Sequence, residues 1–277
     1  MIYRNFLPLL LICFGVFSNV GCQNLFRSTY GTVSREEVPV LEVPQAKLLP
    51  DVDASTNDPV WQQAVVVPEL PMVASKYTKD LATSATELRL LWAPEALFIR
   101  FVCEDDVLVV PYMGRDNKHQ NGDIVEVLFD PARQQREWFE VQVTPLNQIL
   151  DLSYQVTGDA KWYADGVMSD ESIQLQRKVN LGWDCDGLRT SAHIQDDATW
   201  VVEMAIPASV LYEADDYNGQ LQPGLVLHAN FIRYERWGRP IAGKKARGYM
   251  VPMQWAPTVY GKPNLSPHLM GELHLVE

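Results

Sequence analysis

Short runs of alternating apolar and polar residues make up most of the chain after residue 50. In residues 96–103 (ALFIRFVC), alternate positions place Leu97, Ile99, Phe101 and Cys103 on one face of an extended strand. Residues 137–144 (EWFEVQVT) alternate in the same way, as do 123–130, 148–154, 188–195, 199–206, 225–234 and 271–276. Turn-forming residues separate these runs, so we predict about ten antiparallel strands that pack as a β-sandwich.

Helical periodicity is confined to two short segments. They are the run near Asp58 (DPVWQQA) and the run from Pro207 (PASVLYEAD), and the second places proline in the first turn. The length permits one large β domain as easily as two small ones. We predict one all-β domain over residues 51–277, an antiparallel sandwich of the jelly-roll type with one or two short helices.

The first 21 residues have the pattern of an export signal. Arg4 gives a positive start, residues 6–17 are uncharged and largely apolar, and small or uncharged residues lead to Cys22. The apolar run is shorter than the roughly 20 residues of a membrane-spanning helix, so we predict cleavage. Residues 19–22 (NVGC) resemble the lipobox of bacterial lipoproteins, although Asn19 stands where leucine is usual. The resemblance implies that Cys22 is lipidated.

Residues 22–50 are predicted to be a lipidated N-terminus and a flexible tether, because they combine prolines, mixed charges and no sustained period. Gln23 is not the aspartate that favours inner-membrane retention, so the outer membrane is favoured. The alternative is ordinary secretion, which also places the chain outside the cytoplasm. In that compartment Cys103 and Cys185 could form a disulfide; alternatively, Cys103 is a buried strand thiol and Cys185 a loop thiol.

The charge and the missing motifs exclude several classes of function. The chain has 23 Lys+Arg against 35 Asp+Glu, a formal net charge of −12, and its one basic cluster is at residues 244–247. Binding of nucleic acid needs basic clusters that neutralise phosphates, so nucleic acid is not an expected partner. The sequence has no GxSxG, GxGxxG, P-loop, HExxH or CxxC motif. We therefore predict a protein that is not an enzyme.

Nine sequence blocks follow one another between residues 57 and 275: NDPVW, LRLLWAPEALFIRFVCEDD, NGDIVEVLFDP, WFEVQVTPLNQILD, GLRTSAHI, TWVVEMAIPASVL, LHANFIRYER, MQWAPT and LMGELHL. This succession resembles the family 9 carbohydrate-binding modules and the wider group of similar domains, over nearly all of residues 51–277. The resemblance implies a DOMON-like sandwich that binds carbohydrate without catalysis. It also implies structural calcium in some members and an association with glycoside hydrolases.

The resemblance also suggests binding residues. The acidic position of the family's D-x-V-E-x-F-x-D strand resembles Glu126, the polar position of the next strand resembles Gln142, and the asparagine of a later N-F strand resembles Asn230. Sugar rings stack on aromatic rings, and their hydroxyls need hydrogen-bond partners. Four further candidates follow from this chemistry, the guanidinium groups and indole rings of Arg115, Arg233, Trp237 and Trp255.

The chain departs from the family at the two tryptophans that clamp the sugar. One place holds His119 or Gln120 and the other holds Asn264. Substitutes from nearby loops could be Tyr112 and Tyr260. Each single residue also has a structural interpretation: a tryptophan in the core, or a solvated arginine.

Other chemistry stays open at this level. Asp105, Asp106 and Asp123 are weak candidates for calcium, which takes about six to eight oxygen ligands, although acidic turns are commonly only solvated. Related DOMON-like domains bind haem b, so an electron-transfer domain is an alternative. Its axial ligands would be Met113 with His119, or Met204 with His228. A structural or partner-binding envelope protein is another alternative, and glycoside hydrolysis would require two carboxylates converging in a cleft.

Overall fold

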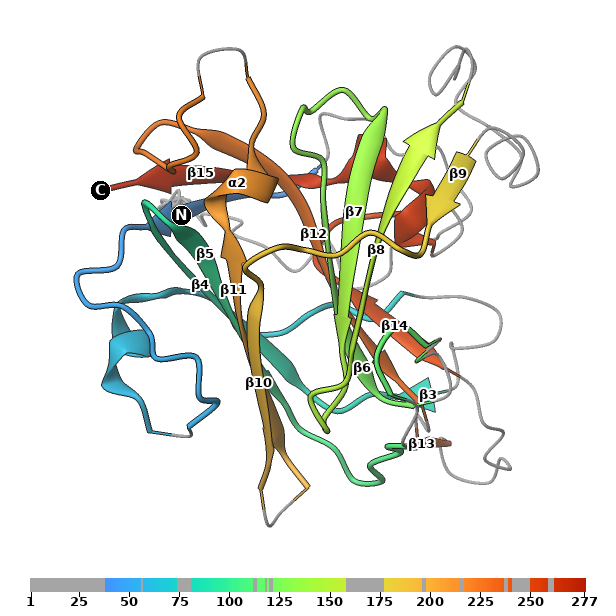
Figure 1. The fold of residues 1–277 in the computed structure, drawn as a ribbon. Helices are drawn as coiled ribbons and strands as arrows, with labels where there is room; N and C mark the ends of the chain where they lie inside the picture. Colours follow the sequence, from blue (N-terminus) through green and yellow to red (C-terminus); the bar gives the residue numbers. More distant parts are fainter. Residues whose placement is uncertain are drawn as a thin grey trace, which may run out of the picture.

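The computed structural model describes residues 38–55, 57–73, 81–111, 114–117, 119, 122–157, 177–195, 198–214, 217–236, 239–240, 250–258 and 262–277. The predicted signal peptide, Cys22 and Trp237 lie outside these residues. The described chain forms two β-sheets that pack face to face, with one short α-helix (Figure 1). The predicted β-sandwich is therefore confirmed.

The larger sheet has eight strands. Their order is β1-β15-β12-β6-β7-β8-β9, and β14 pairs with β12 beside this path. All neighbours are antiparallel except β1 and β15, which are parallel. The strands are β1 (Val40–Pro44), β6 (Ile124–Phe129), β7 (Glu137–Val143), β8 (Ile149–Val156), β9 (Arg177–Asn180), β12 (Val226–Glu235), β14 (Val251–Gln254) and β15 (Gly271–Val276).

The smaller sheet has five strands, in the order β10-β11-β5-β4-β2. They are β2 (Val65–Val67), β4 (Thr86–Ala93), β5 (Ala96–Cys103), β10 (Arg189–Ile194) and β11 (Trp200–Pro207). A separate pair joins β3 (Leu81–Ala82) to β13 (Arg239–Pro240).

The four helical segments formed by the described residues are short. Two of them, the 3-10 helix η2 (Pro59–Gln63) and the α-helix α2 (Ala208–Leu211), occupy the predicted positions. The Asp58 side chain caps η2 by accepting a hydrogen bond from the Val60 amide at 2.9 Å. The other two are the 3-10 helices η4 (Pro263–Leu265) and η5 (Pro267–Leu269). No described helix is long and apolar enough to cross a membrane.

The main core fills the space between the two sheets. The face of β5 that the alternation predicted to be apolar is fully buried. In the larger sheet the core face of β6 carries Val125, Val127 and Phe129. Each such side chain contributes about 1.5–3 kcal/mol when it leaves water. The intervening residues of β6 face the opposite side, which we call the outer face of the eight-stranded sheet.

Cys103 and Cys185 are both free and buried, so the disulfide is not formed. Burial raises the pKa of each thiol to about 12. Because the thiolate is the reactive form, both cysteines are expected to be inert side chains of the fold.

The first strand corrects the predicted tether boundary. Residues 40–44 form β1 beside β15, and Val43 is fully buried opposite Leu275. The sandwich thus begins before residue 51. The sequence hid this strand because it is only five residues long and its partner is at the far end of the chain.

We expect removal of residues 22–50 to lower the free energy of unfolding by about 1.5 kcal/mol or more, since the burial of Val43 alone accounts for that amount. A variant that lacks only residues 22–37 is the control, and urea denaturation of both is the measurement. Equal stability of the two variants would show that β1 does not belong to the cooperative fold.

Candidate functional site

Three polar side chains from neighbouring strands meet on the outer face of the eight-stranded sheet. The β6–β7 register places Glu126 directly opposite Gln142, and Glu140 lies two residues before Gln142 on the same face. The Gln142 amide donates from Nε2 to Glu126 Oε2 at 2.9 Å and to Glu140 Oε1 at 2.6 Å. One amide therefore bridges two carboxylates.

Strand β8 and the C-terminal segment extend this network. The Tyr154 hydroxyl donates to Glu140 Oε2 at 2.7 Å, and Asn264 donates from Nδ2 to the Tyr154 oxygen at 3.2 Å. The Arg177 guanidinium stacks over the Tyr154 ring at 4.4 Å and donates to the Asn264 carbonyl at 2.6 Å. We call these residues the polar cluster: Glu126, Glu140, Gln142, Tyr154, Arg177 and Asn264.

The polar cluster is buried in apolar surroundings. Glu126 and Gln142 are each 3% exposed. Around them pack side chains of the sheet and of the C-terminal segment, among them Leu128, Trp138, Ile232, Leu265 and Met270. Burial raises the pKa of Glu126 well above its ordinary value, and the nearby Glu140 carboxylate raises it further. The pKa of Glu140 is also raised by burial, although its hydrogen bonds oppose that effect.

Two atoms of the polar cluster have unused hydrogen-bonding capacity. Gln142 Oε1 is a buried acceptor and Arg177 Nε is a buried donor, and neither has a hydrogen-bond partner among the described residues. Buried polar atoms are nearly always paired in folded proteins. A ligand hydroxyl both donates and accepts, so it could satisfy atoms of either kind.

The sequence predicted two members of this cluster, Glu126 and Gln142, and the structure brings them into contact. It did not single out Glu140, Tyr154 or Arg177. Strand alternation places Glu140 and Gln142 on the same side, which was a usable signal. Nothing local to residue 177 or 264 indicates that the two lie over β8.

Asn230 shares the outer face but has a different role. Its Oδ1 accepts from the Ala256 amide at 2.9 Å and its Nδ2 donates to the Ala256 carbonyl at 3.3 Å. The side chain thus holds the segment after β14 against β12.

Arg233 is on the opposite face, between the two sheets, and its side chain is fully buried. It binds Asp105 at 2.8 Å and donates to the Thr86 hydroxyl at 3.0 Å, while its guanidinium lies over the Trp200 ring. It is neither near Glu126 nor a solvated surface arginine. Arg233 lies two positions after Phe231 in the alternating run, so the two side chains share a face of the strand. This spacing was the signal for the placement of Arg233.

The proposed calcium residues do not form a cluster. Asp105 binds Arg233, and Asp123 accepts hydrogen bonds from the Val109 amide at 2.6 Å and the Arg236 amide at 2.7 Å. Burial raises the pKa of Asp123 to about 6. Asp106 is exposed in the turn after β5. The carboxylates of Asp105 and Asp123 therefore organise the loops around β5 and β6.

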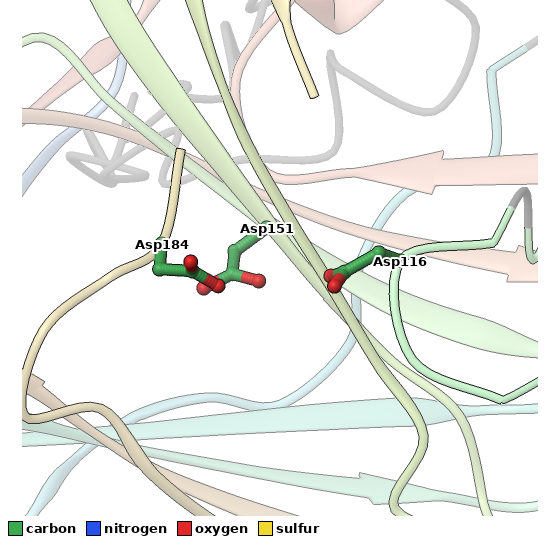
Figure 2. A group of neighbouring side chains, drawn as sticks. All are labelled: Asp116, Asp151 and Asp184. Carbon is green, nitrogen blue, oxygen red and sulfur yellow. The ribbon is translucent and has the colours of Figure 1, made fainter. Parts of the chain in front are cut away.

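A different trio of carboxylates comes together at the start of β8. Asp116, Asp151 and Asp184 place oxygens within 4.8 Å of one another (Figure 2). The Arg115 guanidinium binds this trio, at 2.7 Å from Asp151 and 2.8 Å from Asp184. Arg115 was predicted to hold sugar hydroxyls, and in the structure it is the cation that these three acidic groups share.

Trp255 packs inward and not as an open platform. Its ring centroid is 5.5 Å from that of Phe231, and it covers Gly271, where an added Cβ would come within 2.5 Å of the indole. His119, at one of the family's tryptophan places, is buried and lies 2.9 Å from the Gly114 carbonyl. Asn264, at the other place, belongs to the polar cluster. The other suggested aromatics, Trp237, Tyr112 and Tyr260, lie outside the described residues.

Met204 and His228, one of the two pairs suggested as haem ligands, lie on opposite sides of the eight-stranded sheet. Met204 is fully buried in the main core, whereas His228 alternates with the core residue Leu227 and points to the outer face, 3.8 Å from Glu272. These two side chains cannot bind the same iron. Met113, in the other suggested pair, lies outside the described residues.

The fold and its family define the class of the protein, a carbohydrate-binding module, which is a sugar-binding β-sandwich domain of a typically non-catalytic kind. Residues 52–230 match the family described as carbohydrate family 9 binding domain-like, and the chain belongs to this family. No curated protein matches the chain significantly.

Solved structures of low sequence identity share the fold. A family 9 carbohydrate-binding module from Caldicellulosiruptor kristjanssonii in complex with cellotriose is 15% identical, with 86% of this chain and 94% of that chain covered and a TM-score of 0.52. The complex of such a module from the same organism with glucose is 14% identical, with 84% and 95% covered and a TM-score of 0.50. A candidate carbohydrate-binding protein from Bacteroides uniformis is 10% identical, with 86% and 99% covered and a TM-score of 0.58.

Proposed function

We propose that this protein is a lipid-anchored, extracytoplasmic carbohydrate-binding protein that holds glycan at the polar cluster and has no catalytic activity of its own. The observation that carries the proposal is the bridge from Gln142 to two buried carboxyl groups, with an acceptor and a donor of the same cluster unpaired within the described part of the chain. Such groups match hydroxyls, which donate to carboxylates and accept from a guanidinium.

Burial of the polar cluster adds a condition to this proposal. Leu265 and Met270 pack in the same apolar cluster that surrounds the polar residues. Glycan therefore reaches the site when the C-terminal segment that carries them is displaced. The sugar then replaces hydrogen bonds between protein groups, which gives selectivity for a ligand that presents hydroxyls in matching positions.

The arrangement of Glu126 and Glu140 supports binding more than hydrolysis. Glycosidase carboxylates flank a sugar bond from two sides and are separated by at least about 5 Å. Here one amide nitrogen contacts both carboxylates, and each side chain is almost completely buried. The proposed role in polysaccharide breakdown is therefore to hold glycan near separate glycoside hydrolases.

The test of glycan binding is calorimetric titration of the lipid-free protein with a panel of oligosaccharides that includes glucose and cellotriose. We expect Glu126→Gln to weaken binding at least tenfold, because a carboxyl group that offers two oxygens to ligand hydroxyls is replaced by an amide of the same shape with only one acceptor oxygen. Glu42→Gln is the matched control, since Glu42 is an exposed glutamate on β1. Equal binding by wild type and Glu126→Gln would contradict the proposed site.

The lipid anchor is tested separately with Cys22→Ser. Acylation needs the thiol, so we expect the variant to lose incorporation of labelled palmitate and to leave the membrane fraction in a Gram-negative host. Cys103→Ser is the control, because that thiol is buried in the core. Unchanged labelling in Cys22→Ser would favour ordinary secretion.

A further inference from the structure

The opposite face of the eight-stranded sheet carries a second group of polar side chains, in two rows across β7, β8 and β9. The register aligns Phe139 with Ser153 and Asn180 in one row. It aligns Glu137 with Gln155 and Lys178 in the next row. Because these positions are two residues apart along each strand, all six side chains lie on one face, the face of the main core.

Two adjoining cavities lie over these rows. One, of about 330 Å³, is lined by aromatic residues from β7, from the segment after β9 and from the segment after α2. The other, of about 200 Å³, is lined by the polar residues of β8 and β9. Both include Glu137 and Ser153, so they form one continuous depression. We call it the aromatic groove, and its central residues are Glu137, Trp183, Tyr212, Tyr217, Lys178 and Asn180.

The aromatic residues of the groove are held in place by contacts with one another and with neighbouring backbone. Trp183 stacks on Phe139 with ring centroids 5.1 Å apart and an interplanar angle of 27°. Tyr212 packs edge to face against Tyr217 at 5.1 Å, and the Tyr217 hydroxyl donates to the Ala208 carbonyl at 2.9 Å. These rings are half-buried, so one part of each ring packs against the protein and another part is accessible to a ligand. Binding to rigid rings costs little conformational entropy.

The polar end of the groove is open to solvent. Glu137, Gln155, Lys178 and Asn180 are exposed, and they offer a carboxylate, two amides and an ammonium group within one depression. This set can both accept hydrogen bonds from hydroxyls and donate to them. The combined volume falls in the range of small-molecule sites, about 300–1,000 Å³.

We propose that the aromatic groove is a second saccharide-binding site, separate from the polar cluster and on the other face of the same sheet. Its ligand is a neutral oligosaccharide, with one ring stacked against Trp183 and the tyrosines and the next ring among Glu137, Lys178 and Asn180. The exposed carboxylates of Glu137 and Glu213, on a chain of net charge −12, disfavour acidic glycans. The aromatic groove is open in this structure, whereas the polar cluster is covered.

The experiment is calorimetric titration of the lipid-free mature protein with cellotriose and other neutral di- and trisaccharides. We expect Trp183→Ala to weaken binding at least tenfold, because the stacking surface is lost. The double substitution Lys178→Ala and Asn180→Ala should also weaken it, and both side chains are exposed, so folding is retained. Lys47→Ala is the control, an exposed lysine before η2. Circular dichroism and thermal melting of each variant verify the fold.

The outcomes separate the two sites. If the groove variants weaken binding and Glu126→Gln does not, the result supports the aromatic groove and counts against the polar cluster. If two binding events are seen and each is lost in one variant, the result supports both sites. Binding that is lost only in Glu126→Gln overturns the aromatic groove and leaves the polar cluster as the site. If none of the saccharides binds, both proposals are wrong. Binding of a peptide in the aromatic groove, without binding of any saccharide, would likewise overturn the proposal.

Discussion

Arg233→Met is expected to lower the free energy of unfolding by about 3–5 kcal/mol, the range for removing one partner of a buried ion pair. The substitution keeps the apolar stem but leaves the Asp105 carboxylate, whose side chain is 3% exposed, without its cation. It also removes the hydrogen bond to Thr86, which joins β12 of one sheet to β4 of the other. Urea denaturation followed by tryptophan fluorescence measures the loss.

A double-mutant cycle tests the cause of this loss. Asp105→Asn in the Arg233→Met background removes the uncompensated charge, so we expect it to recover part of the stability. Arg189→Met on the exposed edge strand β10 is the control and should change stability by less than about 0.5 kcal/mol. A loss below about 1 kcal/mol in Arg233→Met would show that the ion pair is not a main link between the two sheets.

Glu126→Gln is expected to stabilise the protein at high pH while it weakens glycan binding. Burial and the neighbouring Glu140 carboxylate raise the pKa of Glu126 above its ordinary value of 4.5. When the pH rises above 4.5, the unfolded chain releases this proton and the folded chain keeps it. The unfolded state then binds fewer protons, so the stability of the wild type falls as the pH increases. Glutamine cannot ionise and is free of this loss.

The measurement is the difference in unfolding free energy between Glu126→Gln and the wild type at several pH values. We expect no difference near pH 4 and a gain of about 1–3 kcal/mol for the variant at pH 8, within the usual range for single substitutions. Glu42→Gln is the control for the replacement of an exposed carboxylate. A stabilised variant that binds glycan poorly is the signature of a residue kept for function at the expense of stability. A constant difference at all pH values would rule out the ionisation of Glu126 as its origin.

Most of the sandwich could be predicted because apolar residues recur at every second position of its strands. The runs in β5, β7 and β11 have an apolar residue at every second position, and those positions are the core of the structure. β1 was missed because a short strand has too few positions to show a period. The alternation also carried information that the prediction did not use. Arg233 lies at a position of β12 that faces the core, and Glu140 lies on the same face of β7 as Gln142.

The candidate site could be predicted only in part. Glu126 and Gln142 were predicted from their positions in adjacent strands, and the β6–β7 register pairs them. Arg177 and Asn264 also belong to the polar cluster and contact each other, although 87 positions separate them in the sequence. No local pattern reports such a contact. Arg115 was predicted to bind ligand, and it is held by aspartates from two distant segments.

The sequence by itself determined most of the strands, the apolar face by which they enter the core and the family to which the chain belongs, because these depend on local alternation and on the order of the blocks. The tertiary structure alone decided which polar side chains are buried together. A carboxylate on a strand has the same local sequence whether solvent or another segment covers it. The pairing of Glu126 with Glu140, the inter-sheet position of Arg233 and the shape of the aromatic groove follow from that packing.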